Sequence, residues 1–246
     1  MKQIILALCL VSTATFAAEK QTFQSNETQA VLLELFTSEG CSSCPPADAW
    51  ISRLKSSSDL WKNVVPVVFH VDYWDRLGWR DRFAKREFTA RQHRYAAEWQ
   101  SSSVYTPAFV ANGREWRNWT DGGTVPTTSS GKVGMLSVTI DETRKIVARF
   151  TPTSQSNESF QIHIALLGSN LESNVARGEN SGRKLHHDFV ALATATAGMQ
   201  RQADEYFAEI ILPNEQSFDK PTALAAWITS GDGKPPIQTT GGWLKP

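Results

Sequence analysis

The chain has 246 residues, of which 41% are hydrophobic, and its 25 Lys and Arg residues balance 25 Asp and Glu residues. This length allows one large domain or two small ones. A chain without net charge offers no excess of basic residues to a polyanion, so nucleic acid is not expected among its partners.

Residues 1–17 have the pattern of a secretory signal peptide. A basic residue precedes an apolar run at residues 4–11, and small residues lead to a cleavage site near Ala17. The run is much shorter than the ~20 residues that a membrane-spanning helix needs, so no integral membrane segment is expected after cleavage. We expect a periplasmic or secreted protein, in a compartment where disulfides persist. Cleavage would remove Cys9 and leave Cys41 and Cys44 as the cysteines of the mature chain.

The next elements suggest a parallel β-α-β unit. Residues 30–36 (AVLLELF) read as a buried strand, and a helical pattern begins at Pro45, where proline suits a first helical turn. A second apolar run at residues 64–71 follows at the spacing of a right-handed crossover. Ligand sites in such sheets lie at the carboxyl ends of the strands. This arrangement would bring Cys41 close to Asp72.

A second helix is predicted over residues 80–100, followed by a short strand at residues 108–111. Pro107 comes directly before that strand, and the Asn-Gly pair at residues 112 and 113 indicates a hairpin turn after it. A proline that enters a strand lacks a ladder donor. Pro107 is therefore expected at an edge or with a special peptide geometry such as a cis bond.

From Thr120 the composition changes to glycine, threonine and serine, which indicates a linker. Beyond it the periodicity is typical of strands separated by polar turns. Six such runs without a strong helical pattern predict a β-sandwich. The runs are MLSVTI, KIVARF, FQIHIALLG, HHDFVALATAT, YFAEIIL and LAAWIT.

The order strand, C-x-x-C, helix, strand, helix, Thr-Pro, strand and hairpin resembles the thioredoxin superfamily. In that resemblance Cys41 and Cys44 match the redox pair, and Thr106 and Pro107 match the residue and the cis-proline that face it. The segments LELFTSEGCSSCPPAD, HVDYWDRLGW, YTPAFVANG, RGENSGRKLHHDFV and QTTGGWL are similar to a family of secreted bacterial proteins with a thioredoxin-like domain and no established function.

The resemblance implies an α/β thioredoxin-like domain followed by a mainly antiparallel β-sandwich domain. The expected division is a signal peptide at residues 1–17, a thioredoxin-like domain at 18–122, a linker at 123–134 and the sandwich-like domain at 135–246.

The expected chemistry is that of a thiolate. A helix N-terminus favours an anion and lowers a cysteine pKa from its free value of about 8.5. Cys41, at an exposed helix entry, would be the nucleophile, and Cys44 would resolve the mixed disulfide from one turn inside. The resemblance implies that Thr106 and Pro107 bind the substrate chain.

Three further residues are candidates for a supporting role behind the cysteines. Glu34 is a carboxylate within an apolar strand, where it must be paired or protonated, and it could assist proton transfer at Cys44. His70 and Asp72 lie at the end of their strand, with structural hydrogen bonding as the alternative role.

A metal site is not expected at the adjacent residues His186 and His187. Neighbouring strand residues point to opposite faces, so these two side chains make a poor metal pair. Both are expected at the surface or in a turn.

These features predict an exported thiol-disulfide oxidoreductase that acts through Cys41 and Cys44 on protein or small thiol substrates. No cofactor and no metal site are expected, and the partners would be exported proteins or a redox partner. Two alternatives stay open. One is a non-catalytic binding module, and the other is a Cu(I) carrier that uses the two thiolates.

Overall fold

The structure, a computed structural model, describes residues 20–120, 123–126, 131–154, 158–212, 220–231 and 234–245. The predicted signal peptide and Cys9 lie outside these residues. Within the described ranges, none of the helices has the length and apolar character needed to span a membrane.

The described residues contain helices α1 (Pro45–Ser52) and α2 (Arg86–Glu98) and the short 3-10 helices η1 (Arg53–Ser56) and η2 (Asp75–Leu77). The strands of the first half are β1 (Gln21–Gln24), β2 (Val31–Thr37), β3 (Val64–His70), β4 (Ala108–Ala111) and β5 (Arg114–Trp116). Those of the second half are β6 (Gly134–Ile140), β7 (Lys145–Pro152), β8 (Gln161–Gly168), β9 (Leu171–Asn174), β10 (Lys184–His187), β11 (Val190–Gly198), β12 (Gln200–Gln202), β13 (Glu205–Ile211), β14 (Ala223–Thr229) and β15 (Pro236–Trp243).

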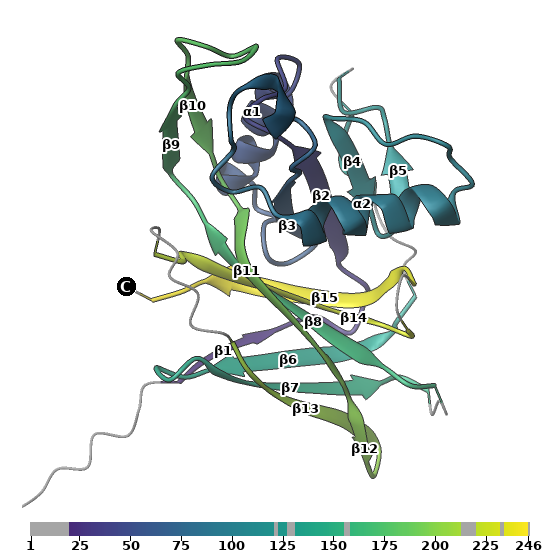
Figure 1. The fold of residues 1–246 in the computed structure, drawn as a ribbon. Coiled ribbons are helices and arrows are strands. Elements are labelled where there is room, and N and C mark those ends of the chain that lie inside the picture. The colour runs from purple at the N-terminus through teal and green to yellow at the C-terminus, as the bar shows by residue number, and fades with distance from the viewer. Residues whose placement is uncertain are drawn as a thin grey trace, which may run out of the picture.

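Strands from both halves of the chain form one eight-stranded sheet, in the order β15-β14-β8-β11-β3-β2-β4-β5. Strand β3 is parallel to β2 and to β11, and the other neighbours in this sheet are antiparallel. The junction of the halves is a backbone hydrogen bond of 2.8 Å from Val68 N to Phe189 O. The long strands β8 and β11 run from the helical end of the molecule down to the second sheet (Figure 1).

The expected fold class, an α/β thioredoxin-like domain followed by a separate sandwich, is therefore wrong. The molecule is mainly β-sheet, and the strands assigned to a sandwich extend the sheet of β2 and β3. The physical reason lies in strands that are buried on both faces. Ile162 and Ile164 of β8 enter the core between the two sheets, whereas Ala165 and Leu167 enter the core beneath the helices. Such strands read as continuous apolar runs and give no sign of which layers they join.

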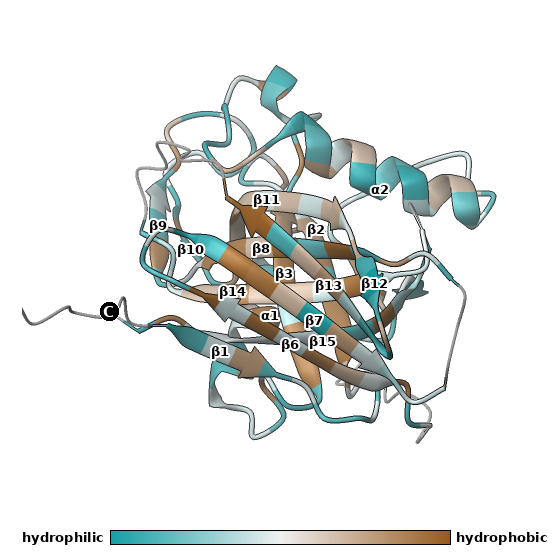
Figure 2. Cartoon of the chain, turned by 90° about the horizontal axis from the view of Figure 1, so that it is seen from below, coloured by the Kyte–Doolittle hydropathy of each residue, from teal (hydrophilic) through white to brown (hydrophobic). Residues whose placement is uncertain are grey.

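The second sheet has five strands in the order β1-β6-β7-β13-β12. Its first strand comes from the N-terminal part of the chain, where Gln21 pairs with Ile140 of β6. Buried residues alternate with more exposed ones along β7 and β13, as expected of a sheet with one face on a core and one face in water. Figure 2 shows both hydrophobic (brown) and hydrophilic (teal) residues along these two strands.

Several local predictions are confirmed. Strands β2, β3 and β4 and helix α1 begin within a few residues of the predicted positions, and the turn at Asn112 and Gly113 has positive φ values of 45° and 79°. Helix α2 is shorter than residues 80–100, because Asp81 and Phe83 are buried in the loop before it. The apolar run at residues 186–196 is divided between β10 and β11 at Phe189, which has a φ of 58°.

Candidate functional site

Cys41 and Cys44 form a disulfide in the loop that connects β2 to α1. Their Cα atoms are 5.4 Å apart. The turn is held by backbone hydrogen bonds from Cys41 N to Ser38 O at 3.1 Å and from Cys44 N to Cys41 O at 3.2 Å. Cys44 is the N-cap residue of α1. The pair thus lies at the carboxyl end of a buried parallel strand, as the sequence predicted.

The start of α1 has few backbone donors to offer a thiolate. Pro45 and Pro46 occupy its first two positions, and proline has no N–H. The hydroxyl of Ser43 lies 3.3 Å from Cys41 Sγ and can donate to it. An anionic Cys41 would therefore depend on the helix dipole and on this hydroxyl more than on free amides.

The hairpin tip at residues 175–183, between β9 and β10, covers the disulfide from the second half of the chain. Asn180 is fully buried, and its Nδ2 donates to Glu39 O and to Cys41 O, each at 2.9 Å. Cys41 and Cys44 are both 0% exposed. The expected exposure of Cys41 is therefore wrong, because this hairpin, which rises beside α1 in Figure 1, encloses the turn.

A second residue of the tip binds the turn from outside. Glu179 Oε2 accepts hydrogen bonds from Ser42 Oγ at 2.7 Å and from Ser42 N at 3.2 Å. These bonds lower the pKa of Glu179. Arg183 Nη1 donates to Asn180 Oδ1 at 2.8 Å, which fixes the amide orientation within the tip. The hairpin tip therefore binds the C-x-x-C turn at the backbone of the turn and at the Ser42 side chain.

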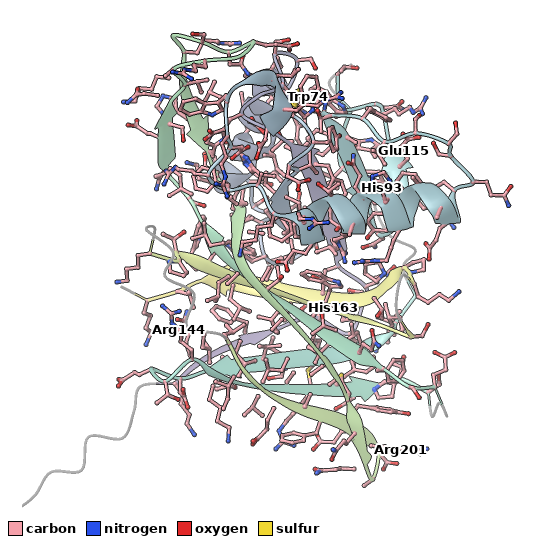
Figure 3. The ribbon with its side chains drawn as sticks, in the orientation of Figure 1. Trp74, His93, Glu115, Arg144, His163 and Arg201 are labelled. Atoms are coloured by element: carbon pink, nitrogen blue, oxygen red, sulfur yellow. A yellow bond between two sulfur atoms is a disulfide. The ribbon has the colours of Figure 1, made fainter. Side chains whose placement is uncertain are left out.

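The Thr106–Pro107 peptide bond is cis, which confirms the expected special geometry. A tryptophan connects this segment to the cysteine turn. Trp74 Nε1 donates to Thr106 Oγ1 at 2.8 Å, and a Cβ atom built on Gly40 would lie 3.0 Å from Trp74 Cβ. Trp74 is labelled at the α1 end of the molecule in Figure 3. The Trp74 side chain thus lies between Thr106 and Gly40, the residue before Cys41.

Glu34 faces α2 and takes part in a buried ion pair. Its Oε1 is 2.5 Å from Arg91 Nε, and its Oε2 accepts from the Tyr95 hydroxyl. Burial raises the pKa of Tyr95 well above its ordinary value. A carboxylate held in this way is a structural partner of α2, and the proton-transfer role considered for Glu34 finds no contact to support it.

Asp72 also anchors α2. Its Oδ1 accepts from Thr89 Oγ1 at 2.6 Å, and its backbone N donates to the same hydroxyl at 3.1 Å. The alternative considered for Asp72, structural hydrogen bonding, describes these contacts.

His70, in contrast, lies in a group of five buried ionisable side chains, here called the buried cluster. Its members come from the loop before the cysteines, from α1, from the end of β3, from the loop after η2 and from β10, and they are Glu39, Asp48, His70, Asp81 and His187. His70 Nδ1 is 2.7 Å from Asp81 Oδ2. The His70 and His187 ring centroids are 5.0 Å apart.

His187 lies between two carboxyl groups of the buried cluster. Its Nε2 is 3.5 Å from Glu39 Oε1, and its Nδ1 is 3.8 Å from Asp48 Oδ2. It is 2% exposed, whereas His186 points to solvent. The expectation that the two histidines face opposite sides is confirmed, and the surface position expected for His187 is wrong.

Burial and charge act in opposite directions on the pKa values of the buried cluster. Burial raises the pKa of Asp48, and the neighbouring histidines only partly oppose it. Burial disfavours protonation of His70, but the charge and hydrogen bond of Asp81 outweigh it and raise the pKa of His70. Burial would also raise the pKa of Asp81, yet His70 holds it below its ordinary value. His70 and Asp81 therefore stabilise each other's charged forms, whereas burial disfavours the charged form of Asp48.

Few features of the sequence indicate the buried cluster. Asp48 lies in the first turn of a helix and Asp81 stands between two arginines, and at both kinds of position a carboxylate is usually solvated. Alternation along a strand could have identified His187 as the inward member of its pair. Within the described ranges, no three or more His, Cys, Asp or Glu side chains are arranged to hold a metal ion.

The sequence profile of a family described as "Protein of unknown function (DUF1223)" matches residues 32–229. No protein of curated function matches the sequence. Among solved structures, the chain is similar to the crystal structure of a protein from Agrobacterium tumefaciens. The TM-score is 0.61 and the identity 24%, over 89% of this chain and 95% of that one. It is also similar to HBP35 of Porphyromonas gingivalis, with a TM-score of 0.59 and 14% identity, over 89% of this chain and 76% of that one. These likenesses concern the fold alone.

Proposed function

The chain belongs to the DUF1223 family of unknown function, and we propose that it is an exported thiol-disulfide oxidoreductase that uses Cys41 and Cys44. The single observation that carries this proposal is the buried cluster next to the disulfide. Ionisable groups with shifted pKa values gather at functional sites, because burying charge is unfavourable and persists only where something offsets it. Export rests on the signal-peptide pattern of residues 1–17.

A purely stabilising disulfide explains these observations less well. A bridge that encloses four residues restrains the unfolded chain by only about 2 kcal/mol in the chain-entropy model, against about 3 kcal/mol for a 15-residue loop. Such a bridge needs no ionisable groups beside it. The buried cluster is therefore better explained by a disulfide that opens and closes.

The proposed reaction is a two-electron exchange between the pair and a substrate dithiol. A substrate thiolate attacks Cys41 Sγ, the bond between Cys41 and Cys44 breaks, and Cys44 leaves as a thiolate. A second substrate thiolate then attacks the substrate sulfur of the mixed disulfide and releases Cys41. The substrate is oxidised to a disulfide and the pair is reduced to two thiols. The reverse sequence reduces a substrate disulfide.

Substrate binding is proposed at Thr106 and Pro107, which are half-buried and joined to the cysteine turn through Trp74. An extended substrate chain placed there would lie beside Gly40 and Cys41. Because both sulfurs are covered in the oxidised form, the substrate reaches Cys41 only after the hairpin tip at residues 175–183 moves away. The partners would be exported proteins or small thiols able to displace this tip.

A redox titration of the purified mature protein tests the proposal. The protein is equilibrated with mixtures of reduced and oxidised dithiothreitol, and its free thiols are counted by mass tagging. The expected result is one reversible transition of two thiols, with the same midpoint from either direction while the fold is retained. A Cys41→Ser variant is the matched control, because its single remaining cysteine should show no such transition. A wild-type pair that opens only on global unfolding would contradict the proposal and favour the non-catalytic binding module.

A further inference from the structure

A cleft of about 360 Å³, here called the α2 cleft, lies between α2 and strands from the second half of the chain. Its wall is one face of α2, from Glu87 to Arg94, and its floor is formed by residues of β8, β11 and β14. His163 of the floor lies below α2 in Figure 3. The cleft forms because β11 meets β3 at one residue pair, Val190 and Val68, and then runs down to the second sheet (Figure 1). Ligand pockets form preferentially where two structural units meet in this way.

A β-bulge in β11 turns two threonines toward the α2 cleft. The register against β8 shifts between Ala191 and Ala193. Side chains two residues apart on a regular strand share a face, yet Ala191 packs beneath the helices and Ala193 enters the core between the sheets. In the regular pleat that follows, Thr194 and Thr196 point to the side of α2, and both line the cleft. Bulges of this kind redirect side chains beside functional sites.

The floor of the α2 cleft is polar and holds a neutral imidazole. His163 Nδ1 is 2.9 Å from Thr196 Oγ1, and His163 Nε2 is 3.0 Å from Thr229 Oγ1. Burial, and with it the charges of Arg91 and Arg94, lowers the pKa of His163 to about 3. The charges that a ligand would meet in the cleft are therefore those of α2.

The two arginines of the wall differ in their partners. Arg91 is half-buried, its Nε pairs with Glu34 Oε1 at 2.5 Å, and its Nη2 donates to the Tyr95 hydroxyl at 3.1 Å. Its guanidinium carbon lies 5.0 Å from the centroid of the Trp227 ring. Arg94, one turn further along α2, is exposed and has no hydrogen bond or ion pair with a residue in the described ranges. Arg94 is therefore the uncompensated cation of the α2 cleft.

Glu87 supplies a negative charge at the other end of the α2 cleft. It lies two turns before Arg94, about 10 Å away along the helix axis. Its Oε1 accepts from Thr194 Oγ1 at 3.0 Å, which holds the carboxylate against β11. The charge of Arg94 acts on His163, which pairs with Thr196 across the strands. Because Thr194 and Thr196 are about 7 Å apart along β11, the two charges lie at opposite ends of a short channel.

We propose that the α2 cleft binds a linear zwitterion such as an ω-amino acid. The carboxylate of the ligand accepts two hydrogen bonds from the Arg94 guanidinium. The ammonium group donates to Glu87, whose Oε2 has no partner within the described part of the chain. The chain between the two ionic groups lies over Thr194 and Thr196. A dicarboxylate would place a second anion beside Glu87, and an α-amino acid is too short to reach both ends. This inference does not depend on the redox chemistry of the cysteines.

Isothermal titration calorimetry of the purified mature protein tests the inference with three probes of equal chain length. They are 6-aminohexanoate, hexanoate and adipate, which differ at the end that would face Glu87. We expect 6-aminohexanoate to bind and hexanoate to bind about tenfold more weakly, because hexanoate lacks the charge-assisted hydrogen bond to Glu87. Adipate should bind most weakly, because its second carboxylate is repelled. An absence of binding by 6-aminohexanoate at millimolar concentration would overturn the inference, and so would equal binding of the three probes.

Two variants at exposed positions of α2 locate the bound probe. Arg94→Gln should weaken the binding of 6-aminohexanoate and hexanoate about tenfold. Glu87→Gln should remove the preference for 6-aminohexanoate over hexanoate and strengthen the binding of adipate. Arg86→Gln and Glu98→Gln are the matched controls, because they neutralise the same residue types at exposed positions of α2 outside the cleft. They should keep the wild-type affinities.

Unchanged binding by Arg94→Gln, or an equal loss in Arg94→Gln and Arg86→Gln, would place the probe elsewhere and overturn the inference. The order of the three probes is measured on the wild-type protein, so a variant that folds poorly does not leave the inference untested.

Discussion

Replacing Asn180 with Ala should expose the cysteine pair. The substitution removes the two hydrogen bonds from Asn180 Nδ2 to Glu39 O and Cys41 O. At about 1 kcal/mol each, their loss lowers the free energy of opening the hairpin tip by about 2 kcal/mol. Since 1.36 kcal/mol corresponds to a factor of ten in rate, the disulfide should be reduced about 30-fold faster.

The assay is reduction by dithiothreitol followed by mass tagging, at several urea concentrations well below the unfolding transition. Opening of the tip alone exposes little surface, so the rate should depend only weakly on urea. The Asn174→Ala variant, at an exposed position of the same hairpin, serves as the control and should match the wild type. Equal rates for Asn180→Ala and Asn174→Ala would refute the reasoning. A urea dependence as steep as that of global unfolding would also refute it, because the tip would then not open by itself.

Three further outcomes are expected. Arg91→Leu should lower the free energy of unfolding by about 3–5 kcal/mol, because Glu34 would stay buried without its cation; an unchanged urea midpoint would show that the pair adds nothing. Burial, with nearby arginine charges, lowers the pKa of His163 to about 3, so only the unfolded state binds this proton between about pH 6.5 and 3. As the pH is lowered through that window, the free energy of unfolding should fall by up to roughly 5 kcal/mol. In urea-unfolding measurements at several pH values, the His163→Gln variant should show a smaller fall. Cys44→Ser should trap mixed disulfides with exported proteins and Cys41→Ser should not, as judged by non-reducing electrophoresis; adducts on both variants would argue against a single nucleophile.

Local structure near the cysteines was predictable because it depends on short-range physics. Proline at the start of α1, the buried run of β2 and the Asn-Gly turn at residues 112 and 113 each act within a few residues. The joining of the halves was not predictable in this way. Strand β11 meets β3 through Val190 and Val68, and no pattern in a single sequence specifies that partner.

The candidate site likewise contains some residues that could be predicted from the sequence and others that could not. Cys41 and Cys44 were identifiable from spacing, since chemistry at a C-x-x-C turn is local. Asn180 was not, because its role consists of two bonds to backbone carbonyls 139 and 141 residues away in the chain. Asp48 looked like an ordinary first-turn acid of a helix, which normally stabilises the helix from solvent. Only the burial of α1 against β10 changes that reading.

The hairpin tip lies far from the cysteines in the sequence, and this separation has a consequence for inheritance. The hairpin tip that closes over the cysteine turn and the histidine beside Asp48 are encoded in a different half of the gene from the cysteines themselves. An insertion between β9 and β10 would change the contacts of a disulfide that lies more than a hundred residues earlier in the chain. Recombination between diverged relatives at the middle of the gene would separate the turn from the tip that fits it. The two halves are therefore expected to descend together, as one heritable unit.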